Sequence, residues 1–168
     1  TDPAIGYLFR DVDDGLALLM ALDSPEIEVI GITISTGNTD HAKAKQAAFR
    51  VLEAIDRPGI PVFSGAPGPG DLVEETEASE FIIHSSLEYA GRLVILALGA
   101  LSNVAAAIEQ DPALGRRVAE IVSLGGIIVP PGEPAPRRPV DINYGRDPAA
   151  VGVVLESDAS LSLVTVNT

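Results

Sequence analysis

Four aspartates, Asp2, Asp11, Asp13 and Asp14, lie within the first 14 residues of the chain, directly ahead of the apolar run GLALLMAL. Carboxylates that lie close together repel, and the pKa of one of them rises unless a cation neutralises the pair. Hard divalent ions such as calcium and magnesium bind oxygen ligands from carboxylates, backbone carbonyls and water. Helix capping is the alternative interpretation, because an aspartate at a helix start gains roughly 0.3–1 kcal/mol from the helix dipole. The residue types alone leave both open.

The elements that must position these acids alternate between helix and strand patterns. Apolar periodicity and capping residues predict helices at 12–23, 40–55, 77–89, 102–110 and 147–156, with a short helical turn in 111–118. Short β-branched runs predict strands at 26–35, 60–65, 92–98, 120–126 and 161–166. We expect Asp13 or Asp14 to cap the first helix and Asp147 to cap the last one. The alternation predicts an α/β fold of Rossmann-like type, with a mostly parallel sheet and helices on both faces, in one domain over residues 1–168.

The carboxyl ends of parallel strands meet at one edge of a sheet, where ligands of such folds bind. Polar or glycine-containing turns follow the predicted strands at Asn38, Gly65, Leu98–Asn103, Gly125–Gly126 and Asn167. The Pro- and Gly-rich segments 65–72 and 129–141 are expected to be loops. The first three residues resemble the exit of a strand, and the chain stops where a further turn and helix are expected, so both ends look clipped.

Composition limits the classes of partner. The formal net charge of −13 disfavours nucleic-acid polymers and anionic membrane surfaces, and favours a cation or a small neutral molecule. The chain has no cysteine, which excludes disulfides and thiolate metal sites within it. No stretch resembles a signal peptide or an uninterrupted transmembrane run, so we expect a cytoplasmic protein.

Several segments, taken in order, resemble a known family. These are TDPAIG, DVDDGLAL, SPEIEVIGITISTGN, LALGALSNVAAAI, EIVSLGG, and the pair DIN and DPAAV. Together they are similar to the inosine-uridine preferring nucleoside hydrolases, which are calcium-dependent N-ribohydrolases, and they cover nearly the whole chain. The insert IGYLFRDV, residues 5–12, separates two halves of a motif that is continuous in the family. The resemblance implies hydrolysis of ribonucleosides to a free base and ribose, and it allows a homodimer or homotetramer.

The resemblance also implies a metal site. Asp2 matches the aspartate that binds calcium and takes the proton from the attacking water, and Asp14 matches the aspartate that binds calcium with both oxygens. Leu98 lies where the family offers a main-chain carbonyl to the metal. Asp11 is the alternative to Asp2, although it lacks the following proline of the motif.

The ribose contacts follow in the same way. Asp13 matches the residue that holds ribose hydroxyls, and Asn38 lies at the turn beside the ribose. Asn143 matches the asparagine of the family's EFN motif and is expected to bind substrate and act with Asp2 in catalysis, while Asp141 replaces the glutamate near the ring. Ala135 stands where the family has a further asparagine.

Other residues have competing interpretations. Tyr7 and Phe9, in the insert, either cover the substrate base or pack in the ordinary way. His41 and His84 are not assigned to the site, and Arg137 and Arg138 either clamp an anion or belong to a solvated loop. Two rival functions stay open: a metal-dependent phosphohydrolase, and a catalytically incomplete protein that binds ribosides or calcium.

Overall fold

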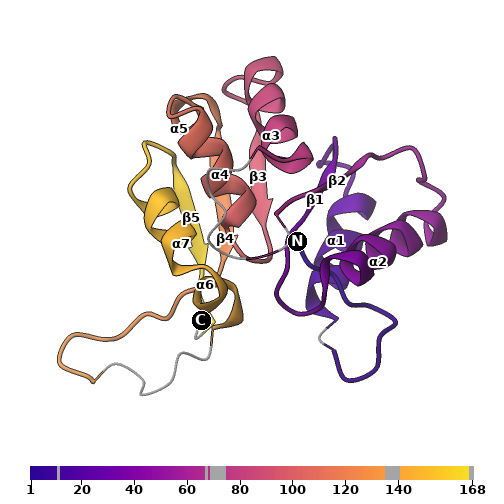
Figure 1. Ribbon diagram of the computed structural model, residues 1–168, viewed down its shortest axis with the longest axis horizontal. Helices are drawn as coiled ribbons and strands as arrows, with labels where there is room; N and C mark the ends of the chain where they lie inside the picture. Colours follow the sequence, from indigo (N-terminus) through magenta and orange to yellow (C-terminus); the bar gives the residue numbers. More distant parts are fainter. Residues whose placement is uncertain (11, 67, 69–74, 135–140, 167–168) are drawn as a thin grey trace.

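The computed structural model describes residues 1–10, 12–66, 68, 75–134 and 141–166. Its strands form two parallel sheets (Figure 1). The first pairs β1, Ile32–Ile34, with β2, Val62–Ser64. The second has the order β3-β4-β5, formed by Val94–Ala97, Glu120–Leu124 and Leu161–Val164. The predicted α/β class with parallel strands is therefore confirmed.

Helices connect the strands along the chain. They are α1 Asp13–Asp23, α2 His41–Ala54, α3 Glu77–Glu88, α4 Ser102–Gln110, α5 Leu114–Arg117, α6 Ile142–Arg146 and α7 Pro148–Leu155. The step from β1 to β2 runs away from β3, whereas the steps from β3 to β4 and from β4 to β5 run in the opposite direction (Figure 1). Because parallel crossovers are right-handed, α2 covers one face and α4 and α7 cover the other. In the described residues, no helix is long and apolar enough to cross a membrane.

Most helix boundaries follow their capping residues. Asp147 accepts from the Ala150 N–H at 3.2 Å at the start of α7, as predicted, and the Asp40 side chain accepts from the Lys43 N–H at 3.0 Å at the start of α2. The predicted cap of α1 is wrong. Val12 occupies the N-cap position without a side-chain bond, and both aspartates lie in the first turn. The Asp14 carboxylate is turned toward the first two residues of the chain and cannot also cap the helix.

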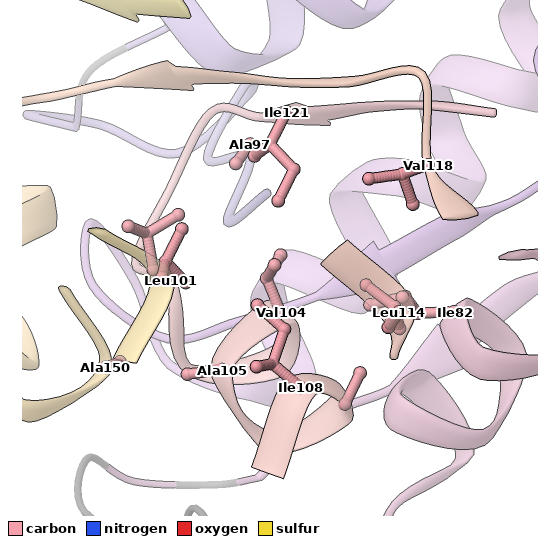
Figure 2. Packing of buried hydrophobic residues seen from close by; sticks show 12 residues of the cluster. Ile82, Ala97, Leu101, Val104, Ala105, Ile108, Leu114, Val118, Ile121 and Ala150 are labelled. Carbon is pink, nitrogen blue, oxygen red and sulfur yellow. The ribbon is translucent and has the colours of Figure 1, made fainter. Parts of the chain in front are cut away.

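Each sheet has its own hydrophobic core. Under β1 and β2, Leu22 and Ile34 pack with residues of α2. Under β3 and β4, Leu101, Leu114 and Ile121 are 0% exposed and form the centre of a larger cluster (Figure 2). The site residues described below are therefore held by two sheets, each of which packs on its own hydrophobic core.

The first predicted strand is shorter than expected. Residues 26–31 are not in a strand, and the β1 ladder begins where the Ile32 N–H donates to the Pro61 carbonyl at 3.0 Å. Pro61 has no N–H to return to β1, which limits the ladder at that point. On the other edge of β1, the Thr1 amine donates to the Thr33 carbonyl at 3.1 Å, and the Ser35 N–H donates to the Thr1 carbonyl at 2.9 Å. Thr1 is thus seated on β1 as a parallel strand residue would be, between the two sheets.

Candidate active site

Asp2 follows Thr1, at the point where the chain leaves the edge of β1 to which Thr1 is bonded. It is 2% exposed. Its Oδ2 accepts a hydrogen bond from the Asn38 backbone N–H. Two glycines make room for the carboxylate: a Cβ at Gly37 would lie 2.7 Å from Oδ2, and a Cβ at Gly99 would overlap Oδ1. These glycines follow β1 and β3, so the turns after the two strands enclose the carboxylate of Asp2.

Asp14 faces Asp2 from the first turn of α1 and is 5% exposed. Its Oδ2 accepts from the Thr1 Oγ1 at 2.6 Å and from the Asp2 backbone N–H at 2.8 Å. Burial, and next the charge of Asp14, raise the pKa of Asp2 to about 6, although the bond from the Asn38 N–H opposes the rise. The two acids therefore form a buried, mutually repelling pair.

A cavity of about 300 Å³ opens in front of this pair. We call it the aspartate cavity. The residues that line it are Asp2, Asp13, Asp14, Asn38, Leu124, Asp141, Ile142, Asn143 and Val166. The structure thus brings together every side chain that the sequence assigned to metal or substrate, from segments that lie far apart in the chain. No Lys or Arg is among these lining residues.

Asn143 connects the far wall of the cavity to the sheet. Its Nδ2 donates to the Leu98 carbonyl at 2.8 Å and to the Leu124 carbonyl at 3.0 Å. The carbonyl assigned to the metal is therefore held by a side chain that lines the aspartate cavity. Since both Nδ2 protons are used, Asn143 can offer a substrate only its Oδ1, as an acceptor for a hydroxyl.

Asp141 has a structural role as well as a place in the cavity wall. Its Oδ2 accepts from the Gly126 N–H at 2.6 Å, and its Oδ1 accepts from the Asn143 N–H at 2.9 Å. It is the N-cap of α6, a short helix between the predicted loop 129–141 and the predicted helix 147–156 that was not predicted from the sequence. The Asp-Ile-Asn-Tyr start was the available signal, because Asp is a preferred N-cap residue.

The donor set suits a hard cation. Two carboxylates, Asp2 and Asp14, and the Leu98 carbonyl supply oxygen only, which calcium and magnesium prefer over nitrogen or sulfur. A cation between the acids would also remove the repulsion that raises the pKa of Asp2. The described part of the chain holds no cluster of three or more His, Cys, Asp or Glu residues that could bind a metal. These residues fit part of a calcium shell, which normally needs about 6–8 oxygens.

The remaining candidates lie elsewhere. His84 is exposed on α3, and the buried Nε2 of His41 has no hydrogen-bond partner within the described part of the chain. Gly125 and Gly126, with φ of 153° and 84°, turn the chain under the Tyr144 ring, so packing and not open ligand space explains them. Asp11, Ala135, Arg137 and Arg138 lie outside the described residues.

Sequence reasoning missed the residues that shape the site without doing chemistry. Gly37 and Gly99 carry no functional group. The reason that both positions require glycine is visible only when the Asp2 carboxylate is placed between them. Ile142 and Val166 give the cavity an apolar wall, and their positions after β4 and β5 were the available signal.

Comparison with known proteins settles the family. The profile described as inosine-uridine preferring nucleoside hydrolase matches residues 1–168. The chain belongs to this family. Uridine nucleosidase 1 of Arabidopsis thaliana is 33% identical over an alignment 193 positions long. The alignment covers 99% of this chain and 55% of that protein. The pyrimidine-specific ribonucleoside hydrolase RihA of Salmonella paratyphi B is 31% identical, covering 86% of this chain and 54% of the relative.

Solved nucleoside hydrolases share the fold. The plant nucleoside hydrolase PpNRh1 superposes with a TM-score of 0.79 at 27% identity, covering 99% of this chain and 58% of that one. An inosine-guanosine nucleoside hydrolase superposes with a TM-score of 0.74 at 26% identity. The chain spans between half and two thirds of the length of these nucleoside hydrolases.

Proposed function

We propose that the protein hydrolyses the N-glycosidic bond of ribonucleosides, giving a free base and ribose. The observation that carries the proposal is the buried Asp2–Asp14 pair at the head of a cavity that is also lined by Asp13, Asn38 and Asn143. Membership of the nucleoside hydrolase family supports it.

The charges in the aspartate cavity suit the reaction. Breaking a glycosidic bond builds positive charge on the sugar ring, which surrounding carboxylates stabilise. Asp13, Asp14 and Asp141 all line the cavity and supply that negative charge. Asp2, whose carboxylate lies at the head of the cavity, accepts a proton from the attacking water.

Calcium is the cofactor we propose, held by Asp2, Asp14 and the Leu98 carbonyl. When bound, it acidifies a coordinated water and draws ribose hydroxyls to itself. Asn143 holds the Leu98 carbonyl in place through its Nδ2 bond of 2.8 Å. The Asn143 Oδ1 accepts from a ribose hydroxyl in this proposal, and Asn38 and Asp13 hold the other side of the ribose.

The substrate class that we propose is the nucleoside, and we assign no particular base. Relatives carry the names uridine nucleosidase, pyrimidine-specific ribonucleoside hydrolase and inosine-guanosine nucleoside hydrolase, which differ in base and agree in the nucleoside. A phosphohydrolase is less well supported, because none of the lining residues of the cavity is a cation that would hold a phosphate ester. We further propose a cytoplasmic protein that assembles as a homodimer or homotetramer.

The test is base release from uridine and inosine, measured with calcium and with a chelator, on protein of verified mass. We expect release that the chelator abolishes, and an Asp2→Asn variant that loses it at least 100-fold because its proton acceptor is gone. Asp23→Asn, a change at an exposed aspartate at the end of α1, is the matched control and should keep the activity. Nucleoside binding without any base release would instead identify the catalytically incomplete binder.

A further inference from the structure

The insert is anchored on the protein at several points. Ile5 packs against the core under β1 and β2. The Tyr7 hydroxyl donates to the Gln46 Oε1 at 2.6 Å, and the Arg50 guanidinium lies 5.5 Å from the centre of the Tyr7 ring. The Arg10 Nη1 donates to the Asn38 carbonyl at 2.7 Å. A segment held in this way is a built feature of the surface, and Figure 1 shows residues 5–10 projecting as an indigo loop beside α1 and α2.

Between these anchors the insert presents two large apolar side chains to water. Leu8 is 85% exposed and Phe9 is 101% exposed, and we call this pair the tip. Phe9 also has a φ of 60°, a left-handed conformation that a non-glycine residue adopts at a cost. Fixed anchors, a strained backbone and exposed apolar groups together indicate that the tip contacts something absent from the isolated chain.

The insert adjoins residues that line the aspartate cavity, although none of its own described residues is among them. The insert begins three residues after Asp2 and ends directly before Asp13. Both aspartates line the cavity. Phe9 and Asp13 are four positions apart in the chain, so their Cα atoms are at most about 14 Å apart. Arg10, the neighbour of Phe9, is bonded to Asn38, which also lines the cavity.

The polarity of the cavity sets the orientation of a bound nucleoside. The acids and Asn38 suit the ribose, whereas Ile142 and Val166, which are 56% and 48% exposed, form an apolar wall. A base is a flat heteroaromatic ring with polar atoms on its edge, and its two faces gain from stacking against aromatic and aliphatic groups. With a formal net charge of −13, the chain has little attraction for an anionic membrane, the other common target of an exposed apolar tip.

We propose that Phe9, supported by Leu8, covers the base of the nucleoside bound in the aspartate cavity and is a specificity-determining residue of this chain. The inference rests on the proposed function for the presence of the nucleoside. Phe9 contributes affinity for the base and none for the ribose. The anchors Tyr7 and Arg10 hold the tip in reach of the cavity.

The test uses the absence of tryptophan from the chain. A Phe9→Trp variant carries the only tryptophan, and its fluorescence is followed while uridine, inosine or ribose is added in the presence of calcium. We expect both nucleosides to shift or quench the emission and ribose to leave it unchanged. Leu87→Trp, at a 57% exposed position on α3, is the control and should respond to none of them.

Calorimetry on Phe9→Ser gives the second measurement. We expect nucleoside affinity to fall about 5–20-fold, which corresponds to the loss of one apolar contact, while calcium affinity stays as in the unchanged chain. Leu87→Ser should match the unchanged chain. Nucleoside binding that is equal in Phe9→Ser, together with a silent Phe9→Trp signal, would overturn the role of Phe9 and leave the proposed function standing. If no nucleoside binds to the unchanged chain, both proposals fail. An emission shift that follows protein concentration without nucleoside would assign the tip to a contact between copies, and would also overturn the proposal.

Discussion

At the scale of the residue, the Asp2 carboxylate is the centre of the site, and the side of it that faces away from the aspartate cavity is closely packed. Gly37 and Gly99 lie against its two oxygens, Asp14 lies beside it, and Asn38 donates to it. A carboxylate placed in this way can bind a cation or hold a proton. One of the two is needed, because a pair of charged acids cannot stay buried without it.

The two glycines should be as important for calcium as the acids. A Cβ at Gly99 would overlap the Asp2 Oδ1, so Gly99→Ala should displace the carboxylate and weaken calcium binding at least tenfold, as measured by calorimetry. Gly152→Ala is the matched control, because nothing lies within 4 Å of a Cβ built there. That change in α7 should raise the free energy of unfolding by about 0.5–1 kcal/mol. Equal calcium affinity in both variants would show that Asp2 does not bind the ion.

The Asp2 pKa predicts a pH dependence of stability in protein stripped of metal. The pKa is raised from 3.8 to about 6, so the fold favours the protonated acid. The corresponding stability is fully present below pH 3.8 and is lost as the pH rises through about 6. At about 1.4 kcal/mol per pKa unit, the loss is up to about 3 kcal/mol. Urea unfolding of the unchanged chain and of Asp2→Asn across this range measures it. A difference between the two proteins that stays constant with pH would contradict the account.

At the scale of the element, the short helix α6 ties β3 and β4 of the larger sheet to the site. Asp141 caps it, and Asn143 on its first turn reaches the carbonyls that end β3 and β4. The site therefore depends on this helix as much as on α1.

Asn143→Leu tests that dependence. The change leaves the Leu98 and Leu124 carbonyls without their donor, at a cost of about 1–3 kcal/mol each when they stay buried. We expect lower stability in urea and weaker calcium binding, because the Leu98 carbonyl is no longer held. Ile142→Ala, a change at a 56% exposed neighbour on the same helix, should affect stability far less. A calcium affinity that survives Asn143→Leu would remove the Leu98 carbonyl from the metal site.

Asp147 makes the corresponding link between α4 and α7. Its Oδ1 accepts from the Ala150 N–H at 3.2 Å and its Oδ2 accepts from the Ser102 Oγ at 2.6 Å, and the residue is 2% exposed. Asp147→Ala should therefore lower the free energy of unfolding by about 1–3 kcal/mol, through the lost cap and the unpaired hydroxyl. Ser102→Ala should cost less, since the cap survives. Equal costs in thermal unfolding would show that the cap contributes nothing.

The elements were largely predictable from sequence because their signals are local. Helices α2 and α7 were predicted close to their observed bounds, and the caps at their starts, Asp40 and Asp147, need only the next few residues. The cap of α1 and the length of β1 were wrong, because distant partners decide them: Asp14 bonds to Thr1, and Pro61 limits the ladder. The same distinction applies to the site. Its acids were named from their types and the family pattern, whereas Gly37, Gly99 and the apolar wall depend on folded geometry.

At the scale of the whole molecule, the two sheets lie on either side of Thr1. The turns that follow their strands contribute to one cavity. Asp2 and Asp14 come from the N-terminal segment, Asn38 from the turn after β1, and Asn143 from the segment after β4. The chain belongs to the inosine-uridine preferring nucleoside hydrolases, and the cavity is formed from the segments that carried the resemblance.

The most direct measurement is a crystal structure determined with calcium, using anomalous scattering to locate the ion. The account predicts one anomalous peak about 2.3–2.6 Å from carboxylate oxygens of both Asp2 and Asp14 and from the Leu98 carbonyl oxygen. A map without a peak between these groups, or with the two carboxylates turned apart into solvent, would contradict it.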